Sequence, residues 1–151
     1  MDYNWITPRI ALGAAPTNHY DANELQVQGV THVVNMCLGH DNKPFFKHTT
    51  IELVYFGMLD GEDEHGLQQI SAAIRYITNA LANNHDHKIY LHCAAGISRS
   101  AAVMTGVLMQ QQQLSLKQAL TMVRLGRPVV NPHPAHLSNL LKISRKDQTA
   151  R

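Results

Sequence analysis

The chain has 151 residues, of which 44% are hydrophobic and 16% charged, so it is long enough for one domain with its own core and is not a disordered chain. The 13 Lys and Arg residues against 11 Asp and Glu residues leave a formal net charge of +2. Because no basic run accompanies this weak charge, we expect no nucleic-acid partner.

Two cysteines, Cys37 and Cys93, are too few for a disulfide framework. The first residues carry neither the basic nor the apolar region of an export signal, and the apolar runs are shorter than the roughly 20 residues that a membrane span requires. No cysteine-rich zinc pattern, dinucleotide motif or internal repeat is present. We therefore expect a single domain over residues 1–151 that works in the cytoplasm and has no membrane partner.

Short apolar runs alternate with helical patterns along the chain. The predicted strands cover residues 10–12, 30–36, 51–56 and 88–92. The predicted helices cover residues 21–28, 67–81, 98–112 and 115–126, and a last helix begins within residues 132–134. Residues 39–49 and 59–66 are expected to form loops, and residues 146–151 a frayed tail. Interleaved strands and helices predict an α/β fold in which helices cover the faces of a sheet.

The helices carry clear local signals. Apolar residues three and four positions apart give the helix over residues 67–81 one buried face: Leu67, Ile70, Ile74, Ile77 and Leu81. The helix over residues 98–112 is apolar nearly all round, which predicts that it is buried. Ser115 and Gln118 fit a capping box. The last helix is expected to turn four side chains inward: Leu137, Leu140, Leu141 and Ile143.

The most informative segment runs from His92 to Ser100, between a predicted strand and a predicted buried helix. A turn of this kind points several backbone N–H groups into the loop, and the helix dipole adds partial positive charge, so the loop suits a phosphate. Arg99 offers a bidentate fork six residues after Cys93, and Gly96 permits a tight turn. The predicted phosphate-binding residues are Ala94, Ala95, Gly96, Ile97, Ser98 and Arg99.

The same electrostatic field acts on the thiol of Cys93. Helix N-termini and nearby cations lower the pKa of a cysteine from about 8.5 to about 3.5–7.5, which makes Cys93 a thiolate at neutral pH. A thiolate beside a bound phosphate is placed to attack phosphorus. Ser100 is expected to donate a hydrogen bond to the sulfur and help it leave. We expect His92 to brace the loop through backbone hydrogen bonds.

Residues 92–100 match the HCxxGxxR[S/T] signature of the cysteine-dependent protein tyrosine phosphatases, in the form typical of dual-specificity phosphatases. The resemblance extends to Trp5–Ala15, which is similar to the family's first strand and turn, to the buried strand Val33–Cys37, and to the RPxxxP segment Arg127–Pro132. The resemblance implies a central mixed, mostly parallel sheet with helices on both faces. It also implies a phosphocysteine intermediate and neither metal nor cofactor.

The chemistry further requires an acid that protonates the leaving oxygen, a step that contributes about 10²–10⁴-fold. The acidic segment over residues 59–64 supplies four carboxylates. Asp60, which lies 33 residues before Cys93, matches the family's acid position best, and Asp63 is the alternative. A solvated acidic loop without a catalytic member is a further interpretation.

Cys37 has two interpretations. It is a small apolar residue that ends a buried strand, or, because Asn35–Cys37 resembles the NxC segment of the tensin-related phosphoinositide phosphatase, a redox partner that captures oxidised Cys93. The pairs His85 with His87 and His133 with His136 lack further ligands at metal-binding spacing, so we expect surface histidines. Asn131 is expected to be a turn or cap residue, and some relatives use this segment to support the loop.

The resemblance implies hydrolysis of phosphotyrosine and phosphoserine or phosphothreonine esters in a phosphorylated protein. The alternatives are a phosphatase of a non-protein ester, such as a phosphoinositide, a sugar phosphate or an RNA 5′ phosphate, and a non-catalytic phosphate-binding module. An arsenate reductase also uses a Cys-x₅-Arg loop, but it needs further cysteines to relay a disulfide. The uncharged side chains of Ala94, Ala95 and Ile97 favour a singly phosphorylated group, because phosphoinositide phosphatases of this superfamily tend to carry Lys in the loop.

Overall fold

The computed structural model describes residues 1–149 of the chain. The strands are β1 (Tyr3–Thr7), β2 (Ile10–Gly13), β3 (His32–Cys37), β4 (Glu52–Met58) and β5 (Ile89–His92). The helices are α1 (His19–Val27), α2 (Glu64–Asn83), α3 (Arg99–Gln112), α4 (Leu116–Gly126) and α5 (Pro134–Thr149), with a short 3₁₀ helix at Lys43–Phe46.

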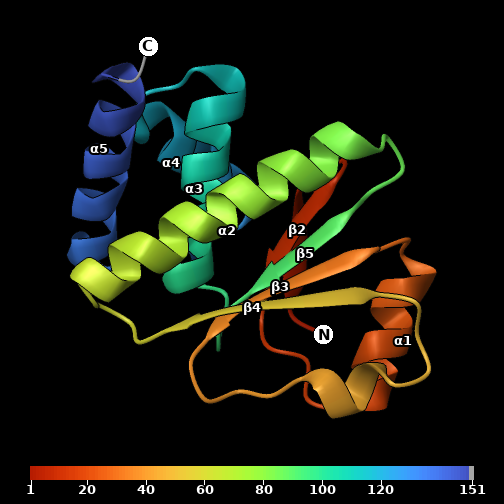
Figure 1. Ribbon diagram of the computed structural model, residues 1–151. Coiled ribbons are helices and arrows are strands. Elements are labelled where there is room, and N and C mark those ends of the chain that lie inside the picture. The colour runs from red at the N-terminus through yellow and green to blue at the C-terminus, as the bar shows by residue number, and fades with distance from the viewer. Residues whose placement is uncertain (150–151) are drawn as a thin grey trace.

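The five strands form one sheet in the order β1-β2-β5-β3-β4. Only the β1–β2 pair is antiparallel, and the other three pairs are parallel. Helix α1 lies on one side of the sheet and α2 to α5 lie on the other (Figure 1). This arrangement confirms the predicted α/β fold with a mixed, mostly parallel sheet between helices.

Alternation along the strands divides the core between the two faces of the sheet. Val33 and Tyr90 pack with Leu25 of α1, whereas their neighbours Val34 and Leu91 pack into the larger cluster beneath α2 to α5. All five side chains are fully buried. A buried side chain of this size contributes about 1.5–3 kcal/mol, so both faces hold the sheet in place.

Several local predictions need correction. Helix α2 begins at Glu64 rather than Leu67, because Leu67 N–H bonds the Asp63 carbonyl (2.8 Å) and completes an earlier turn, so the acidic loop covers residues 59–63. The expected loop over residues 39–49 contains the 3₁₀ helix, which has Pro44 in its first turn. Helix α5 extends to Thr149 and so includes residues 146–149 of the expected tail, whose fraying stays a prediction. Residues 150–151 of the predicted tail lie outside the described residues.

The prediction for Leu141 was also wrong. Leu140 is 1% exposed, whereas Leu141 is 42% exposed. Consecutive helical residues point about 100° apart, so the face that buries Leu140 turns Leu141 outward.

The fold brings the carboxyl ends of parallel strands β3, β4 and β5 to one edge of the sheet. Residues 93–98 connect β5 to α3 at this edge, and residues 59–63 connect β4 to α2. Ligands of α/β sheets bind at such edges, so the topology places the two predicted functional loops where a site belongs. Among residues 1–149, no helix combines the length and the apolar character needed to cross a membrane.

Candidate active site

The backbone carbonyls of residues 93–97 all accept hydrogen bonds from outside the loop. The donors are His92 Nδ1 to Cys93 O (2.9 Å), Ala15 N to Ala94 O (2.9 Å), Arg127 Nη2 to Ala95 O (2.9 Å), Arg127 Nε to Gly96 O (2.8 Å) and Asn131 N to Ile97 O (2.8 Å). In a planar trans peptide the N–H points away from the carbonyl, so the N–H groups of the following residues turn into the loop. This geometry supports the predicted phosphate cradle.

Arg127 is the residue that shapes this loop, and sequence reasoning did not single it out. Its side chain is fully buried yet charged, and besides the two loop carbonyls it bonds Asp2 (2.9 and 3.0 Å) and Asn4 (2.9 Å) of the N-terminal segment. Five donors of one guanidinium therefore tie the loop to β1. The RPxxxP segment was a sign that the position matters, but it carried no indication of this contact.

Gly96 allows the loop to lie against the end of β2. Its φ is +70°, a conformation that favours glycine. A Cβ on Gly96 would lie 2.5 Å from both the carbonyl carbon and the oxygen of Gly13. The loop therefore has no room for a side chain at this position.

The Cys93 thiol is almost fully buried, with 3% of the residue exposed. Its Sγ lies 3.1 Å from the Ser100 Oγ. Burial acts to raise the pKa of the thiol, but hydrogen bonds from the Ser100 hydroxyl and from the N–H groups of Ser100 and Gly96, together with the charge of Arg99, outweigh it and lower the pKa. The surroundings thus favour a thiolate, as expected from the sequence.

His92 braces the base of the loop, and its hydrogen bonds define which of its two ring nitrogens carries the proton. Its Nδ1 donates to the Cys93 carbonyl, which can only accept, so its Nε2 is the acceptor for the Asn42 side-chain amide (3.0 Å). Burial lowers the pKa of His92 to about 4. The ring is therefore neutral at pH 7, and its contacts support the bracing role predicted for it.

Arg99 connects the two loops. Its Nη1 donates to the carbonyl of Met58 (2.8 Å), the last residue of β4 before the acidic loop. The guanidinium has five N–H donors, so this bond leaves others to form the bidentate fork that a phosphate oxygen pair requires.

Asp60 lies against the phosphate loop. Its Oδ1 accepts hydrogen bonds from Ser98 Oγ (2.6 Å) and His136 Nε2 (2.8 Å). Partial burial acts to raise the pKa of Asp60, but these two bonds and the nearby Arg99 lower it. Asp63 lies at the start of α2 and makes no side-chain capping bond. The geometry therefore favours Asp60 over Asp63 as the acid.

The prediction that His136 lies on the surface was wrong. The residue is fully buried in the first turn of α5, because the chain folds α5 over the acidic loop. His85 and His133 are exposed, as expected, and His87 is half-buried. Among residues 1–149, no three His, Cys, Asp or Glu side chains are grouped as metal ligands.

The described contacts do not link Cys37 to Cys93. Met36 packs in the cluster that contains Cys93, whereas its neighbour Cys37 is half-buried and does not belong to that cluster. Both cysteines are free thiols. The redox pairing of Cys37 stays a prediction.

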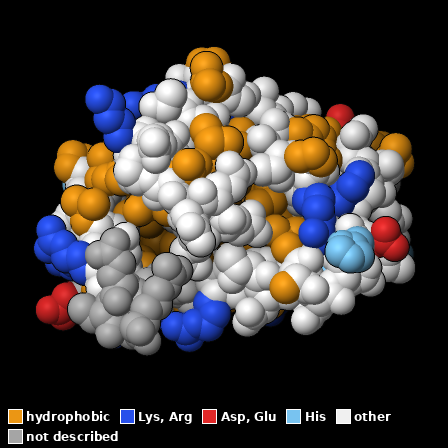
Figure 2. Space-filling view, turned by 90° about the horizontal axis from the view of Figure 1, so that it is seen from above, with side chains coloured by type: hydrophobic (Ala, Val, Ile, Leu, Met, Phe, Trp, Pro, Cys, Tyr) orange, Lys and Arg blue, Asp and Glu red, His pale blue; other side chains and the backbone are white. Residues whose placement is uncertain are grey.

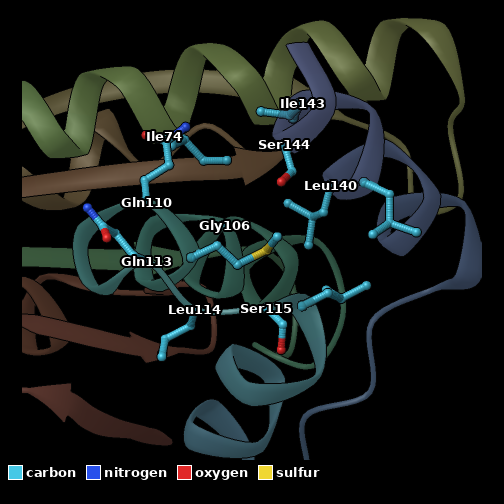
Figure 3. Close-up of a pocket in the computed structure, with 12 residues that line it drawn as sticks. Ile74, Gly106, Gln110, Gln113, Leu114, Ser115, Leu140, Ile143 and Ser144 are labelled. Carbon is cyan, nitrogen blue, oxygen red and sulfur yellow. The ribbon is translucent and has the colours of Figure 1, made fainter. Parts of the chain in front are cut away.

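A groove between the helices is separate from this site. It is a groove of about 440 Å³ among α2, α3, α4 and α5, into which Leu114, Leu140 and Ile143 turn apolar side chains (Figure 3). On the face that Figure 2 shows, the hydrophobic side chains lie in several separate patches, and the Lys and Arg side chains are scattered rather than joined in a basic stripe. None of the predicted catalytic residues lines this groove, so it is not part of the predicted active site.

Comparison with known proteins agrees with this geometry. The model of the dual specificity phosphatase catalytic domain matches residues 10–146. The chain belongs to the dual-specificity phosphatase family. It is 30% identical over 135 residues to dual specificity protein phosphatase 19 of Mus musculus, covering 89% of this chain but only 59% of that relative's length.

Two solved structures of this fold are informative. Human DUSP28 is 25% identical and superposes with a TM-score of 0.80, covering 98% of this chain and 96% of that chain. PTPMT1 in complex with PI(5)P is 20% identical, with a TM-score of 0.83 and coverage of 98% and 97%. The second likeness shows the fold alone.

Proposed function

We propose that the protein hydrolyses phosphate monoesters through a phosphocysteine intermediate. One observation carries the proposal: the buried Cys93 sulfur lies 3.1 Å from the Ser100 hydroxyl, inside a loop whose carbonyls are all bonded outward. Such a site stabilises a sulfur anion and a bound phosphate together, which a cysteine kept for packing does not need.

In the first step, the Cys93 thiolate attacks phosphorus, and the bond between phosphorus and the leaving oxygen breaks. Asp60 gives its proton to that oxygen, so the product leaves as a neutral alcohol or phenol. Arg99 and the loop N–H groups bind the equatorial oxygens on which charge collects.

In the second step, ionised Asp60 takes a proton from water as the water oxygen attacks the phosphocysteine. The phosphorus–sulfur bond breaks and inorganic phosphate forms. The sulfur leaves as a thiolate, which the Ser100 hydroxyl stabilises by donating a hydrogen bond.

For the substrate, we propose phosphotyrosine and phosphoserine or phosphothreonine in proteins. The side chains of Ala94, Ala95 and Ile97 bring no charge into the loop, and the Ser98 hydroxyl is already bonded to Asp60. A second phosphate on the substrate therefore finds no cation within the loop besides Arg99. The fold's likeness to PTPMT1 in complex with PI(5)P makes a phosphoinositide the second candidate.

The first experiment compares Cys93→Ser with wild type on p-nitrophenyl phosphate in a buffer with EDTA and a reducing agent. We expect Cys93→Ser to lose all but a trace of turnover while it still binds a phosphopeptide, because Arg99 and the loop remain. Cys37→Ser is the matched control and keeps wild-type activity. Substantial turnover by Cys93→Ser contradicts the mechanism, and phosphopeptide binding by an inactive wild type indicates a binding module.

The substrate class is tested by comparing wild-type rates on phosphotyrosine and phosphothreonine peptides with rates on phosphatidylinositol phosphate in phosphatidylcholine vesicles. A preference for the peptides by kcat/KM supports the protein substrate. A preference for the vesicles replaces it with the phosphoinositide.

A further inference from the structure

The first turns of α5 hold the acidic loop through side chains. His136 and Asn139 lie on one helix face, three residues apart. Asn139 donates to the Asp63 carbonyl (3.0 Å), and His136 Nε2 contacts both Asp60 Oδ1 (2.8 Å) and the Gly61 N–H (3.2 Å). The position of the proposed acid therefore depends on an element 76 residues further along the chain.

The hydrogen of the Ser98 hydroxyl has a defined direction. Ser98 Oγ accepts a hydrogen bond from the backbone N–H of His133 (2.9 Å) and lies 2.6 Å from Asp60 Oδ1. Because that bond occupies an acceptor position of the hydroxyl, its proton is free to point at the carboxylate. Ser98 thus donates to Oδ1.

The proton between His136 and Asp60 belongs to the ring nitrogen. The Gly61 N–H is also placed to donate to Nε2 (3.2 Å), but one ring nitrogen cannot both donate and accept. Because an ionised carboxylate only accepts, the shorter, charge-assisted contact to Asp60 Oδ1 (2.8 Å) places the proton on Nε2. His136 Nε2 therefore donates to Oδ1, the same oxygen that Ser98 already bonds.

We propose that His136 is a positioning residue for the general acid. With Ser98, it holds Asp60 Oδ1 as an acceptor, so that the catalytic proton resides on the other carboxylate oxygen, Oδ2, which faces no such donor in residues 1–149. This inference rests on the proposed function, in which Asp60 protonates the leaving oxygen.

The burial of His136 supports this role over simple packing. The residue is fully buried, and its Nδ1 has no hydrogen-bond partner within the described part of the chain. A buried polar atom without a partner is unfavourable, and a phenyl ring of similar size would avoid it. The bond from its other nitrogen, Nε2, to Asp60 explains why a histidine rather than an apolar ring occupies this buried position.

The test measures kcat/KM on two substrates that differ in their need for an acid. The p-nitrophenolate group leaves readily as an anion, whereas the leaving oxygen of phenyl phosphate needs a proton. We expect His136→Phe to lower kcat/KM by about tenfold or more on phenyl phosphate, which is part of the whole contribution of a general acid. On p-nitrophenyl phosphate, kcat/KM should fall by less than about threefold. His136→Gln, whose amide N–H reaches as far as Nε2, restores the phenyl phosphate rate.

Two further variants separate positioning from folding. In an Asp60→Asn background, His136→Phe should cause no additional loss, since there is no acid left to position. His85→Phe, which changes an exposed histidine in the turn after α2, is the matched control and leaves both rates unchanged. Thermal melting checks each fold, and if His136→Phe does not fold, His136→Asn, which is too short to reach Oδ1, is compared with His136→Gln.

Equal losses on both substrates, a further loss in the Asp60→Asn background, or equal phenyl phosphate rates for His136→Asn and His136→Gln each overturn the inference. The proposed function fails in a different way, when wild type hydrolyses neither ester.

Discussion

The phosphate loop, residues 93–99, and the acidic loop, residues 59–63, meet at one edge of the sheet but are held by different means. In the phosphate loop, five consecutive carbonyls are bonded by backbone N–H groups, by His92 and by the buried Arg127. In the acidic loop, the side chain of Asp60, the proposed acid, is 47% exposed and is held by two side chains. We therefore expect changes in the phosphate loop to alter the stability of the fold, and changes at Asp60 to alter it little.

The largest expected effect is the loss of activity in Asp60→Asn, a change in the acidic loop that should leave the stability of the fold almost unaltered. Asp60→Asn removes the proton donor, so we expect kcat/KM on phenyl phosphate to fall by about 10²–10⁴-fold. Because the side chain is about half exposed, the free energy of unfolding should change by less than about 1 kcal/mol. The control is Asp63→Asn, which keeps the wild-type rate; a larger loss for Asp63→Asn moves the acid to that residue.

In the phosphate loop, a single substitution should lower both the free energy of unfolding and kcat/KM. Arg127→Met leaves the Ala95 and Gly96 carbonyls without donors, so we expect the free energy of unfolding to fall by about 2–6 kcal/mol, at about 1–3 kcal/mol for each unsatisfied buried carbonyl. Activity should fall on good and poor leaving groups alike. Urea denaturation gives the first quantity and kcat/KM the second.

The matched change at the other end of the Arg127–Asp2 ion pair is Asp2→Asn, where the carboxylate is 72% exposed. The amide oxygen that replaces the Asp2 carboxylate and the side chain of Asn4 still accept hydrogen bonds from the buried guanidinium, so the expected loss is smaller than that of Arg127→Met. If the Arg127→Met variant is well folded and keeps full activity, the distinction between the two loops is wrong.

A smaller effect follows from pH. Burial lowers the pKa of His92 to about 4 in the folded chain from the usual 6.5, so the unfolded chain binds the proton more readily. The contribution of neutral His92 to the free energy of unfolding is complete above about pH 6.5 and is lost as the pH falls toward 4. The total loss is at most about 3 kcal/mol. Denaturation of wild type and His92→Gln between pH 7 and pH 4 tests this, because the variant lacks the titrating ring; equal pH slopes for the two proteins disagree with it.

Sequence reasoning succeeded where the signal is local. The capping box of Ser115 and Gln118 is present at the start of α4, and the apolar spacing of Ile70, Ile74 and Ile77 gave the buried face of α2. The phosphate loop is local as well, since its glycine, arginine and serine lie within nine residues. Interactions between near neighbours determine such features, so the pattern alone identifies them.

The residues that support the site could not be found in this way. His136 bonds a carboxylate 76 residues earlier, and Arg127 bonds Asp2, 125 residues away. A histidine or an arginine outside a motif is most often exposed, and no periodicity marks the partner that a distant segment supplies. Only the fold, which lays α5 over the acidic loop and β1 beside the phosphate loop, makes these residues interpretable.

The contact of Gly96 with Gly13 bears on when the nucleophile becomes active as the chain folds. Gly96 can take its place only after β2 has joined β5 in the sheet, and Arg127 must still arrive from beyond α4. Contacts between segments so far apart form after the local helices, because each closes a long stretch of chain. We therefore expect Cys93 to behave as an ordinary thiol in an unfolded chain, and as a thiolate only once the two ends of the domain have closed around the loop.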